Sequence, residues 1–333
     1  MSFNITWRSL NEKEKEKRND LWGENSSQRD GIISTPYNIY MPKAYEAISE
    51  RILNFKVRED DIWIITYPKC GTTWTQEIVW HVMNDINKEL GKLPLFLRSP
   101  YLEFEGMYDF ASSSGKLFPK EGKHAEMMRK VFVESVDMAA NAPSPRIIKS
   151  HLPFQLLPPN VLDTAKVVYV CRNPKDTCVS FYHHINDTLA MNYHFKGSFD
   201  QFTDCFKAGK LGYGSYFDHL KSGWKWRNHP NMKFIWYEDM RKNSSKEVSA
   251  LAAFLNHPMS KEKVDELVEH LKFSNMKERA TKDEMAFYIN MDKFFRKGEV
   301  GDWKNYFQGE KLKEWDEWIA KNLEGSGIKF NFQ

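Results

Sequence analysis

The sequence predicts an α/β fold, in which a single domain has a mostly parallel central sheet flanked by helices. Short apolar runs typical of buried strands alternate with longer segments of helical periodicity. The first predicted strand leads directly into a tight polar loop and then a helix, which is a common arrangement in parallel sheets. With 41% hydrophobic residues among 333, the chain can bury a sizeable core, and α/β chains of this length are often one domain.

Four segments are predicted as strands because they are short and rich in β-branched and aromatic residues: 62–67, 146–149, 166–171 and 233–237. Helical periodicity indicates helices at about 42–54, 71–90, 123–140, 174–190, 199–208, 214–229, 244–256, 260–271 and 310–321. Since parallel strands need long crossover connections, this alternation favours a parallel sheet.

Two stretches depart from the alternation. Residues 1–30 form a polar N-terminal extension, and residues 105–145 are irregular apart from an amphipathic segment that contains Met127, Met128 and Phe132. We interpret 105–145 as an inserted, lid-like segment of one domain spanning 1–333.

The charge composition excludes a general nucleic-acid or membrane binder. The chain has 48 Lys and Arg against 45 Asp and Glu, so any anion site must be local. No segment has the pattern of a leader peptide or the length of a membrane span. Cys70, Cys171, Cys178 and Cys205 fit neither a metal-binding spacing nor a disulfide framework. A reduced, cytoplasmic protein without a metal is therefore expected.

The segment 66–74, Thr-Tyr-Pro-Lys-Cys-Gly-Thr-Thr-Trp, lies between a predicted strand and a predicted helix. A loop in this position offers backbone N–H groups and the positive end of the helix dipole to a phosphate. Lys69 adds a charge, Thr72 and Thr73 add donors, and Trp74 offers a flat face to a nucleobase. A Walker A loop would carry its lysine after the glycine, so an Mg-bound triphosphate is not expected. An ordinary strand–helix turn is the alternative.

Three further segments carry polar groups suited to a charged ligand. Lys149 and His151 follow a predicted strand, where the histidine can act as a general base or simply cap the strand end. Arg172 ends another strand and can bind a phosphate or pair with Asp176. The run Arg296–Gly298 fits a phosphate-binding loop or a common basic turn. Together these segments suit a nucleotide with two separate phosphates and a hydroxyl that acts as nucleophile.

These motifs resemble those of the cytosolic sulfotransferases that use 3′-phosphoadenosine 5′-phosphosulfate (PAPS). The family loop T-Y-P-K-S-G-T-T-W matches 66–74, with Cys70 in place of serine. The family's other motifs, K-[ST]-H-L-P, R-N-x-K-D…S-x-Y-H, [WF]-Y-E-D-M and R-K-G-x-x-G-D-W-K, match 149–153, 172–183, 236–240 and 296–304. The matches occur in the family's order over about residues 40–310.

The resemblance implies a P-loop-kinase-like sulfotransferase fold and in-line transfer of a sulfuryl group to a hydroxyl of a small apolar acceptor, such as a phenol, steroid or retinoid-like alcohol. It implies that His151 is the general base and that Lys69, Lys149 and Ser180 are also catalytic. The implied residues for PAPS, and for its product adenosine 3′,5′-bisphosphate (PAP), are Lys69, Cys70, Gly71, Thr72, Thr73, Trp74, Arg172, Ser180, Tyr237, Leu271, Phe273, Met276, Phe294, Phe295, Arg296, Lys297 and Gly298. The implied acceptor-binding residues are Tyr45, Tyr101, Phe104, Lys149, His151 and His184.

Three departures from the family pattern give further expectations. Cys70 lies beside Lys69 at a helix N-terminus, so its thiol pKa is expected to fall and its reactivity to rise. Leu271 stands where the family usually has a threonine near the adenine. The family's dimer motif is degraded after Lys304, which predicts a monomer or a weak homodimer.

The length of segment 105–145 is the largest departure, and it resembles an insertion in insect relatives of the retinol dehydratase type. The alternatives are therefore net dehydration of an alcohol through a transient sulfate ester, or a weakly active protein that binds a nucleotide or a hydrophobic ligand.

Overall fold

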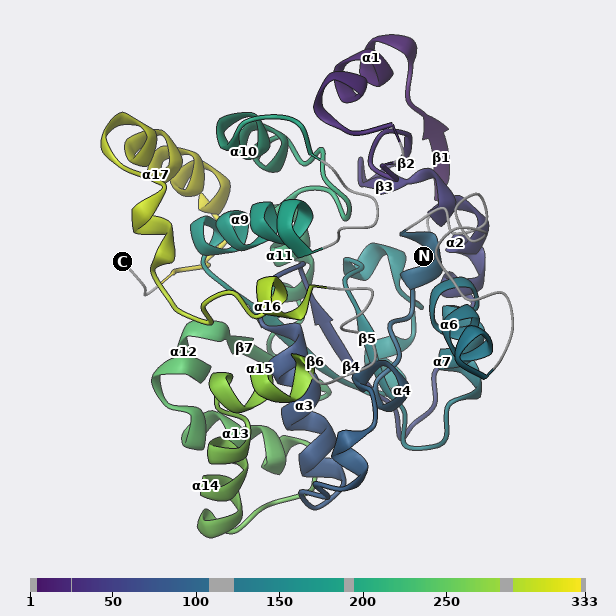
Figure 1. The fold of residues 1–333 in the computed structure, drawn as a ribbon, viewed down its shortest axis with the longest axis vertical. Coiled ribbons are helices and arrows are strands. Elements are labelled where there is room, and N and C mark those ends of the chain that lie inside the picture. The colour runs from purple at the N-terminus through teal and green to yellow at the C-terminus, as the bar shows by residue number, and fades with distance from the viewer. Residues whose placement is uncertain (1–4, 25, 108–122, 189–194, 282–289, 331–333) are drawn as a thin grey trace.

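The protein is described by a computed structural model over residues 5–24, 26–107, 123–188, 195–281 and 290–330 (Figure 1). Its centre is a parallel sheet in the order β5-β4-β6-β7, formed by β4 (Ile62–Thr66), β5 (Ile147–Ser150), β6 (Lys166–Cys171) and β7 (Met232–Trp236). The four predicted strands and the α/β fold are thereby confirmed.

Both faces of this sheet are buried. Ile62 and Ile64 of β4 pack in one apolar cluster with Val79 of α3 (Thr72–Met83), whereas Trp63 and Ile65 pack in a second cluster on the opposite face. Successive residues of a strand point to opposite faces, so a strand that is apolar at every position must be covered on both sides. This accounts for the unbroken apolar run that predicted β4.

The longer helices besides α3 are α2 (Glu46–Leu53), α6 (Lys123–Val133), α7 (Ser135–Asn141), α9 (Pro174–His183), α10 (Phe199–Lys207), α11 (Tyr216–Trp224), α13 (Ser244–Phe254), α14 (Lys261–His270), α15 (Phe273–Thr281) and α17 (Gly309–Leu323). Shorter ones are α4 (Leu95–Arg98), α8 (Val161–Thr164), α12 (Tyr237–Lys242) and α16 (Met291–Phe294). Single 3₁₀ turns lie at Lys43–Tyr45, Leu90–Lys92, Phe104–Gly106, Phe154–Leu156 and Asp302–Asn305.

Several predicted helices are shorter or divided in the structure, and the one predicted at 214–229 spans only Tyr216–Trp224. The helix predicted at 71–90 ends at Met83, because Asp85 and Ile86 have positive φ angles of 50° and 57° that reverse the chain. The helix predicted at 174–190 changes at His184 into a π-helical turn, His184–Thr188. The helix predicted at 123–140 is divided at Glu134, whose ψ of 36° is not helical.

The N-terminal segment contains structure that the sequence pattern did not predict. An antiparallel sheet joins β1 (Thr6–Ser9), β2 (Gly31–Thr35) and β3 (Tyr40–Pro42), and α1 (Glu12–Leu21) lies between β1 and β2. Helix α1 is almost wholly charged, so it has no apolar stripe to detect. A capping box between Asn11 and Glu14 starts it.

Residues 108–122 of the inserted segment 105–145 lie outside the described residues. Phe132 of α6 is buried against Phe104, with ring centroids 4.9 Å apart. Figure 1 shows α6 and α7 beside α2, at one side of the central sheet. A lid-like motion of this segment stays a prediction.

A buried ion pair joins the starts of β4 and β5. Arg146 donates to both carboxylate oxygens of Asp61, at 2.6 and 2.5 Å, and both side chains are at most 1% exposed. Arg146→Met leaves the Asp61 charge buried and unpaired, and we expect the free energy of unfolding to fall by about 3–5 kcal/mol in urea titrations.

The double variant Asp61→Asn/Arg146→Met removes the unpaired charge and is the matched control. We expect it to be more stable than Arg146→Met alone. If the double variant loses as much free energy of unfolding as the two single variants together, this account is contradicted.

Candidate active site

The register of the parallel strands brings the predicted site segments to one edge of the sheet. Ile65 of β4 pairs with Ser150 of β5, and Thr66 pairs with Val170 of β6. The loop after Thr66, His151 and Arg172 therefore follow neighbouring strand ends, which is where open parallel sheets bind ligands.

The loop between β4 and α3 has the conformation of an anion-binding turn. Lys69 and Gly71 have φ angles of 69° and 98°, and Gly71 is the N-cap of α3. A Cβ atom on Gly71 would lie 2.5 Å from the ring of Tyr237, so this close approach requires glycine. Thr66 Oγ1 and Thr72 Oγ1 lie 2.6 Å apart and hold the two ends of the loop together.

Lys69 lies among other cations. Its Nζ is 4.2 Å from the centroid of the Phe294 ring. Burial, together with Lys149, Arg172 and Arg296, lowers the pKa of Lys69 to about 7. An anionic ligand would relieve this repulsion, and the site is therefore electrostatically suited to a phosphate or sulfate group.

The expectation that the Cys70 thiol is activated is wrong. Cys70 is fully buried, and its Sγ lies 3.6 Å from Thr177 Oγ1. Burial raises the pKa of the Cys70 thiol to about 12, because desolvation of the thiolate outweighs the hydrogen bond from Thr177 and the charge of Arg172. The residue acts as a small buried side chain beneath the loop.

His151 is held in one tautomer. Its Nδ1 lies 2.8 Å from the carbonyl oxygen of Thr66, and a carbonyl can only accept, so Nδ1 carries the proton and Nε2 can accept one. Burial and Lys149 keep the pKa of His151 well below 6.5. The imidazole is therefore neutral near pH 7, with a basic nitrogen available to a reacting hydroxyl.

A buried carboxylate supports His151 and was not singled out from the sequence. Glu103 is fully buried and accepts from the backbone N–H of His151 at 2.6 Å. Burial raises the pKa of the Glu103 carboxyl. Burial also lowers the pKa of Lys149, whose Nζ lies 3.9 Å from the centroid of the Tyr101 ring. The sequence feature that could have identified Glu103 is its position as a single acid between the apolar residues Leu102 and Phe104.

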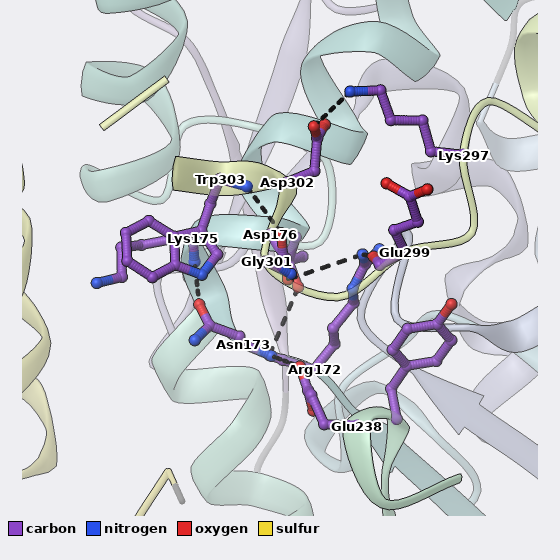
Figure 2. Close-up of polar contacts among 12 residues, drawn as sticks. Arg172, Asn173, Lys175, Asp176, Glu238, Lys297, Glu299, Gly301, Asp302 and Trp303 are labelled. Atoms are coloured by element: carbon purple, nitrogen blue, oxygen red, sulfur yellow. Dashed lines mark hydrogen bonds and ion pairs between the residues drawn. The ribbon is translucent and has the colours of Figure 1, made fainter. Parts of the chain in front are cut away.

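The second cationic region is built on β6 and α9 (Figure 2). Arg172 donates to the carbonyl oxygens of Glu299, at 2.7 Å, and of Lys69, at 3.3 Å, while its Nε has no partner within the described ranges. The alternative pairing with Asp176 is long, at 3.9 Å. Asp176 instead accepts from the backbone N–H groups of Gly301 and Trp303, which ties this C-terminal loop to α9.

Arg296 and Lys297 share one carboxylate. They donate to Asp302 at 2.6 and 2.5 Å, and the Asp302 side chain is 3% exposed. Although burial opposes the shift, Lys297 and Arg296 lower the pKa of Asp302 to about 2. Asp302 therefore stays ionised and positions both cations next to Arg172.

A cavity of about 720 Å³ joins the two cationic regions to an aromatic chamber. Its wall includes every predicted nucleotide-binding residue except Cys70, and every predicted acceptor-binding residue except Tyr45. Tyr45 is fully buried against Trp7, with ring centroids 5.4 Å apart. The wall also contains residues that were not predicted, among them Phe96, Met107, Val131, Met138, Phe181, Ile185 and Tyr213.

The family described as "Sulfotransferase domain" matches residues 59–327. The chain belongs to the sulfotransferase family. It is similar to mouse sulfotransferase 1B1, with 34% identity over 84% of this chain and 88% of the relative. It is also similar to the luciferin sulfotransferase of Photinus pyralis, with 32% identity over 85% of this chain and 77% of the relative.

Solved structures show the same likeness. A retinol dehydratase in complex with retinol and PAP is 30% identical, with a TM-score of 0.87 over 99% of this chain and 100% of that one. The same enzyme has been solved with androsterone and the inactive cofactor PAP. A mouse sulfotransferase complexed with PAP is 27% identical, with a TM-score of 0.67 over 87% of this chain and 94% of that one. The chain is thus an enzyme of this family and has its fold.

The described part of the chain lacks both a cluster of metal-ligating side chains and a membrane-spanning helix. No cluster of three or more His, Cys, Asp or Glu side chains is arranged to hold a metal ion in these ranges. Nor does any described helix combine the length and the apolar character needed to span a bilayer.

The lowered pKa of Lys69 predicts proton uptake on nucleotide binding. In the free protein Lys69 loses its proton as the pH rises through about 7. A bound phosphate raises this pKa, so PAP should bind with uptake of a proton near pH 8, and its affinity should fall as the pH rises further. Calorimetric titration in buffers of different ionisation enthalpy measures the uptake.

The matched control is Lys69→Arg, which keeps a permanent positive charge. This variant should bind PAP with less proton uptake than the natural protein. Equal uptake by the two proteins would assign the linked proton to another group.

Proposed function

We propose that this protein transfers the sulfuryl group of PAPS to a hydroxyl of a small apolar acceptor. The observation that carries the proposal is the position of His151, whose basic Nε2 belongs to a cavity that also contains Lys69, Lys149 and Arg172. A general base next to preorganised cations is what sulfuryl transfer requires, because charge develops on the transferring group.

The residues present fit a nucleotide with two anionic ends. Lys69, Gly71, Thr72 and Thr73 would hold the phosphosulfate end at the N-terminus of α3. Arg172, Ser180, Arg296, Lys297 and Gly298 would hold the 3′-phosphate, and the Nε of Arg172, which has no partner among the described residues, supports this assignment. Bound PAPS supplies the sulfuryl group, and PAP is the product.

The adenine would lie between Trp74 and the apolar wall from Leu271 to Met276. Trp74 and Tyr237 are in edge contact, with ring centroids 6.0 Å apart, and Phe273 and Met276 belong to the same wall. An aromatic face next to apolar side chains suits a planar base.

The chain's own groups then act on the acceptor. The Nε2 of His151 accepts the proton of the acceptor hydroxyl as the oxygen attacks, while Lys69 and Lys149 stabilise the charge that develops. Glu103 and the Thr66 carbonyl keep the imidazole in position. Metal independence, a cytoplasmic location and a monomeric or weakly dimeric state stay predictions.

Aromatic walls support a phenol, steroid or retinoid-like acceptor. Tyr101 stacks on Phe104, with ring centroids 5.1 Å apart, and both Tyr101 and Tyr213 make edge contacts with the His151 ring. The solved relative that binds retinol and androsterone adds support for flat apolar alcohols.

Net dehydration through a sulfate ester is a second candidate function. It is favoured by the likeness to retinol dehydratase, which extends over 99% of this chain. Mass spectrometry of the products formed from retinol and labelled PAPS separates the two outcomes, since the first gives a sulfate ester and the second an alkene with free sulfate. If neither product forms from any acceptor although PAP binds, the protein is a binding protein instead.

Loss of the general base should remove transfer and spare binding. His151→Ala should lower kcat by about 10²–10⁴-fold, measured as sulfated product from 1-naphthol, and leave the calorimetric Kd of PAP nearly unchanged.

Because the His151 pKa lies well below 6.5, kcat/KM of the natural enzyme should not fall through protonation of this residue until the pH is well under that value.

His257→Ala is a suitable control because it removes an exposed histidine. It should turn over like the natural enzyme. Undiminished transfer by His151→Ala would remove this residue from the mechanism.

A further inference from the structure

Gln28 lies in the acceptor cavity although it comes from the N-terminal segment, which the sequence marked only as a polar extension. The residue is 2% exposed, and it lines the same wall as Met107, Gly212 and Tyr213. Gly212 directly precedes Tyr213, whose ring centroid is 5.5 Å from that of His151. The Gln28 side chain therefore belongs to the chamber in which the acceptor would lie.

The backbone of Gln28 is held on both sides. Its carbonyl oxygen accepts from Arg18 Nε at 2.5 Å and from Tyr40 OH at 3.0 Å. Its N–H donates to Ser26 Oγ at 3.2 Å. The Arg18 guanidinium lies 4.1 Å from the centroid of the Tyr40 ring and also donates to the Lys210 carbonyl oxygen. This network ties the N-terminal segment to the body of the protein and gives Gln28 little freedom.

The side-chain amide of Gln28 is oriented by one hydrogen bond. Its Oε1 accepts from the backbone N–H of Gly212 at 3.2 Å, which identifies the oxygen of the amide and leaves the two N–H groups of Nε2 free of this bond. Within residues 5–24, 26–107, 123–188, 195–281 and 290–330, the hydrogen bonds of Gln28 use its carbonyl oxygen, its N–H and Oε1, and none uses Nε2. A buried amide with an unused donor is costly unless a ligand or water satisfies it.

Nearby polar groups of the wall are already used. Tyr101 OH and Tyr213 OH are hydrogen-bonded to each other. Ser135 Oγ donates to the Leu102 carbonyl oxygen at 2.9 Å and accepts from the Glu105 N–H at 3.1 Å. Gln28 differs from these groups because its donor is both held in place and unpaired within the described ranges.

We propose that Gln28 forms a polar subsite of the acceptor cavity, in which Nε2 donates a hydrogen bond to a second oxygen of an otherwise apolar acceptor. This inference rests on the proposed function and refines it. The preferred acceptor carries the reacting hydroxyl at His151 and a carbonyl or ether oxygen elsewhere on its skeleton. An acceptor without that oxygen leaves the donor buried and unsatisfied, so the subsite selects between molecules of equal size.

The test compares acceptors that differ only in the second oxygen. Two pairs cover two lengths: estrone with deoxyestrone, and hydroxytetralone with hydroxytetralin. Calorimetry measures the Kd of each acceptor for the full-length protein saturated with PAP, so that binding is recorded without turnover. For each protein, the ketone preference is the Kd of the acceptor without the ketone divided by the Kd of the ketone. In at least one pair, this preference should be about 5- to 50-fold larger in the natural protein than in Gln28→Leu.

A general loss of packing would weaken the binding of both acceptors, so it would not change the ratio of their two Kd values. Gln28→Met, which keeps the length of the side chain, should change the ratio in the same direction as Gln28→Leu. Met107→Leu is the matched control, since Met107 Cε lies 3.2 Å from where a Cβ on Gly212 would stand and forms no hydrogen bond. Met107→Leu should weaken the binding of both acceptors of a pair by the same factor.

Unchanged ratios for both pairs in both Gln28 variants would overturn the subsite. The proposed function is judged separately, by sulfated product from the same four acceptors with PAPS. A changed ratio without any product would support the subsite and count against sulfuryl transfer to these acceptors. Product with unchanged ratios would support transfer and reject the role of Gln28.

Discussion

The parallel register of β4 with β5 and β6 is the constraint on which the site depends. It aligns Thr66, Ser150 and Val170 at one edge of the sheet, so that the loop containing Lys69, the imidazole of His151 and the guanidinium of Arg172 emerge together. A shift of one residue in either pairing would turn these side chains to the opposite face of the sheet. The apolar clusters on both faces oppose such a shift, because each strand residue is matched to its own cluster.

Crowded cations are the electrostatic consequence of this arrangement. Lys69, Lys149, Arg172 and Arg296 repel one another in a partly buried cavity, and burial together with this repulsion lowers the pKa of Lys69. Glu103, Glu238 and Asp302 lie among them as buried acids, and each also receives a backbone or cationic hydrogen bond. The acids hold the cations and loops in place before a ligand binds, which is how a protein lowers the cost of ordering a charged site.

The site segments were predictable because each has a local signature. A lysine and a glycine between a strand and a helix, a histidine after a strand, and an Arg-Lys-Gly turn are all visible without a structure. Cys70 shows where such reasoning fails, because the neighbours in sequence suggested a lowered thiol pKa, whereas burial raises it. Burial depends on which side chains cover a residue from distant parts of the chain, and Cys70 lies in an apolar cluster drawn from many such parts. Tyr45 was likewise expected at the acceptor and instead packs against Trp7.

The sequence by itself determined the strands of the central sheet and the segments that we propose as phosphate-binding loop and general base, because these depend on apolar runs and on short motifs. Only the tertiary structure decided that a charged helix and three short strands would form in the N-terminal segment, that Gln28 would reach the cavity and that Glu103 would support His151. Their contacts join residues up to nearly two hundred positions apart, as between Gln28 and Gly212. No periodicity of neighbouring residues encodes such contacts, since they arise from the packing of whole elements.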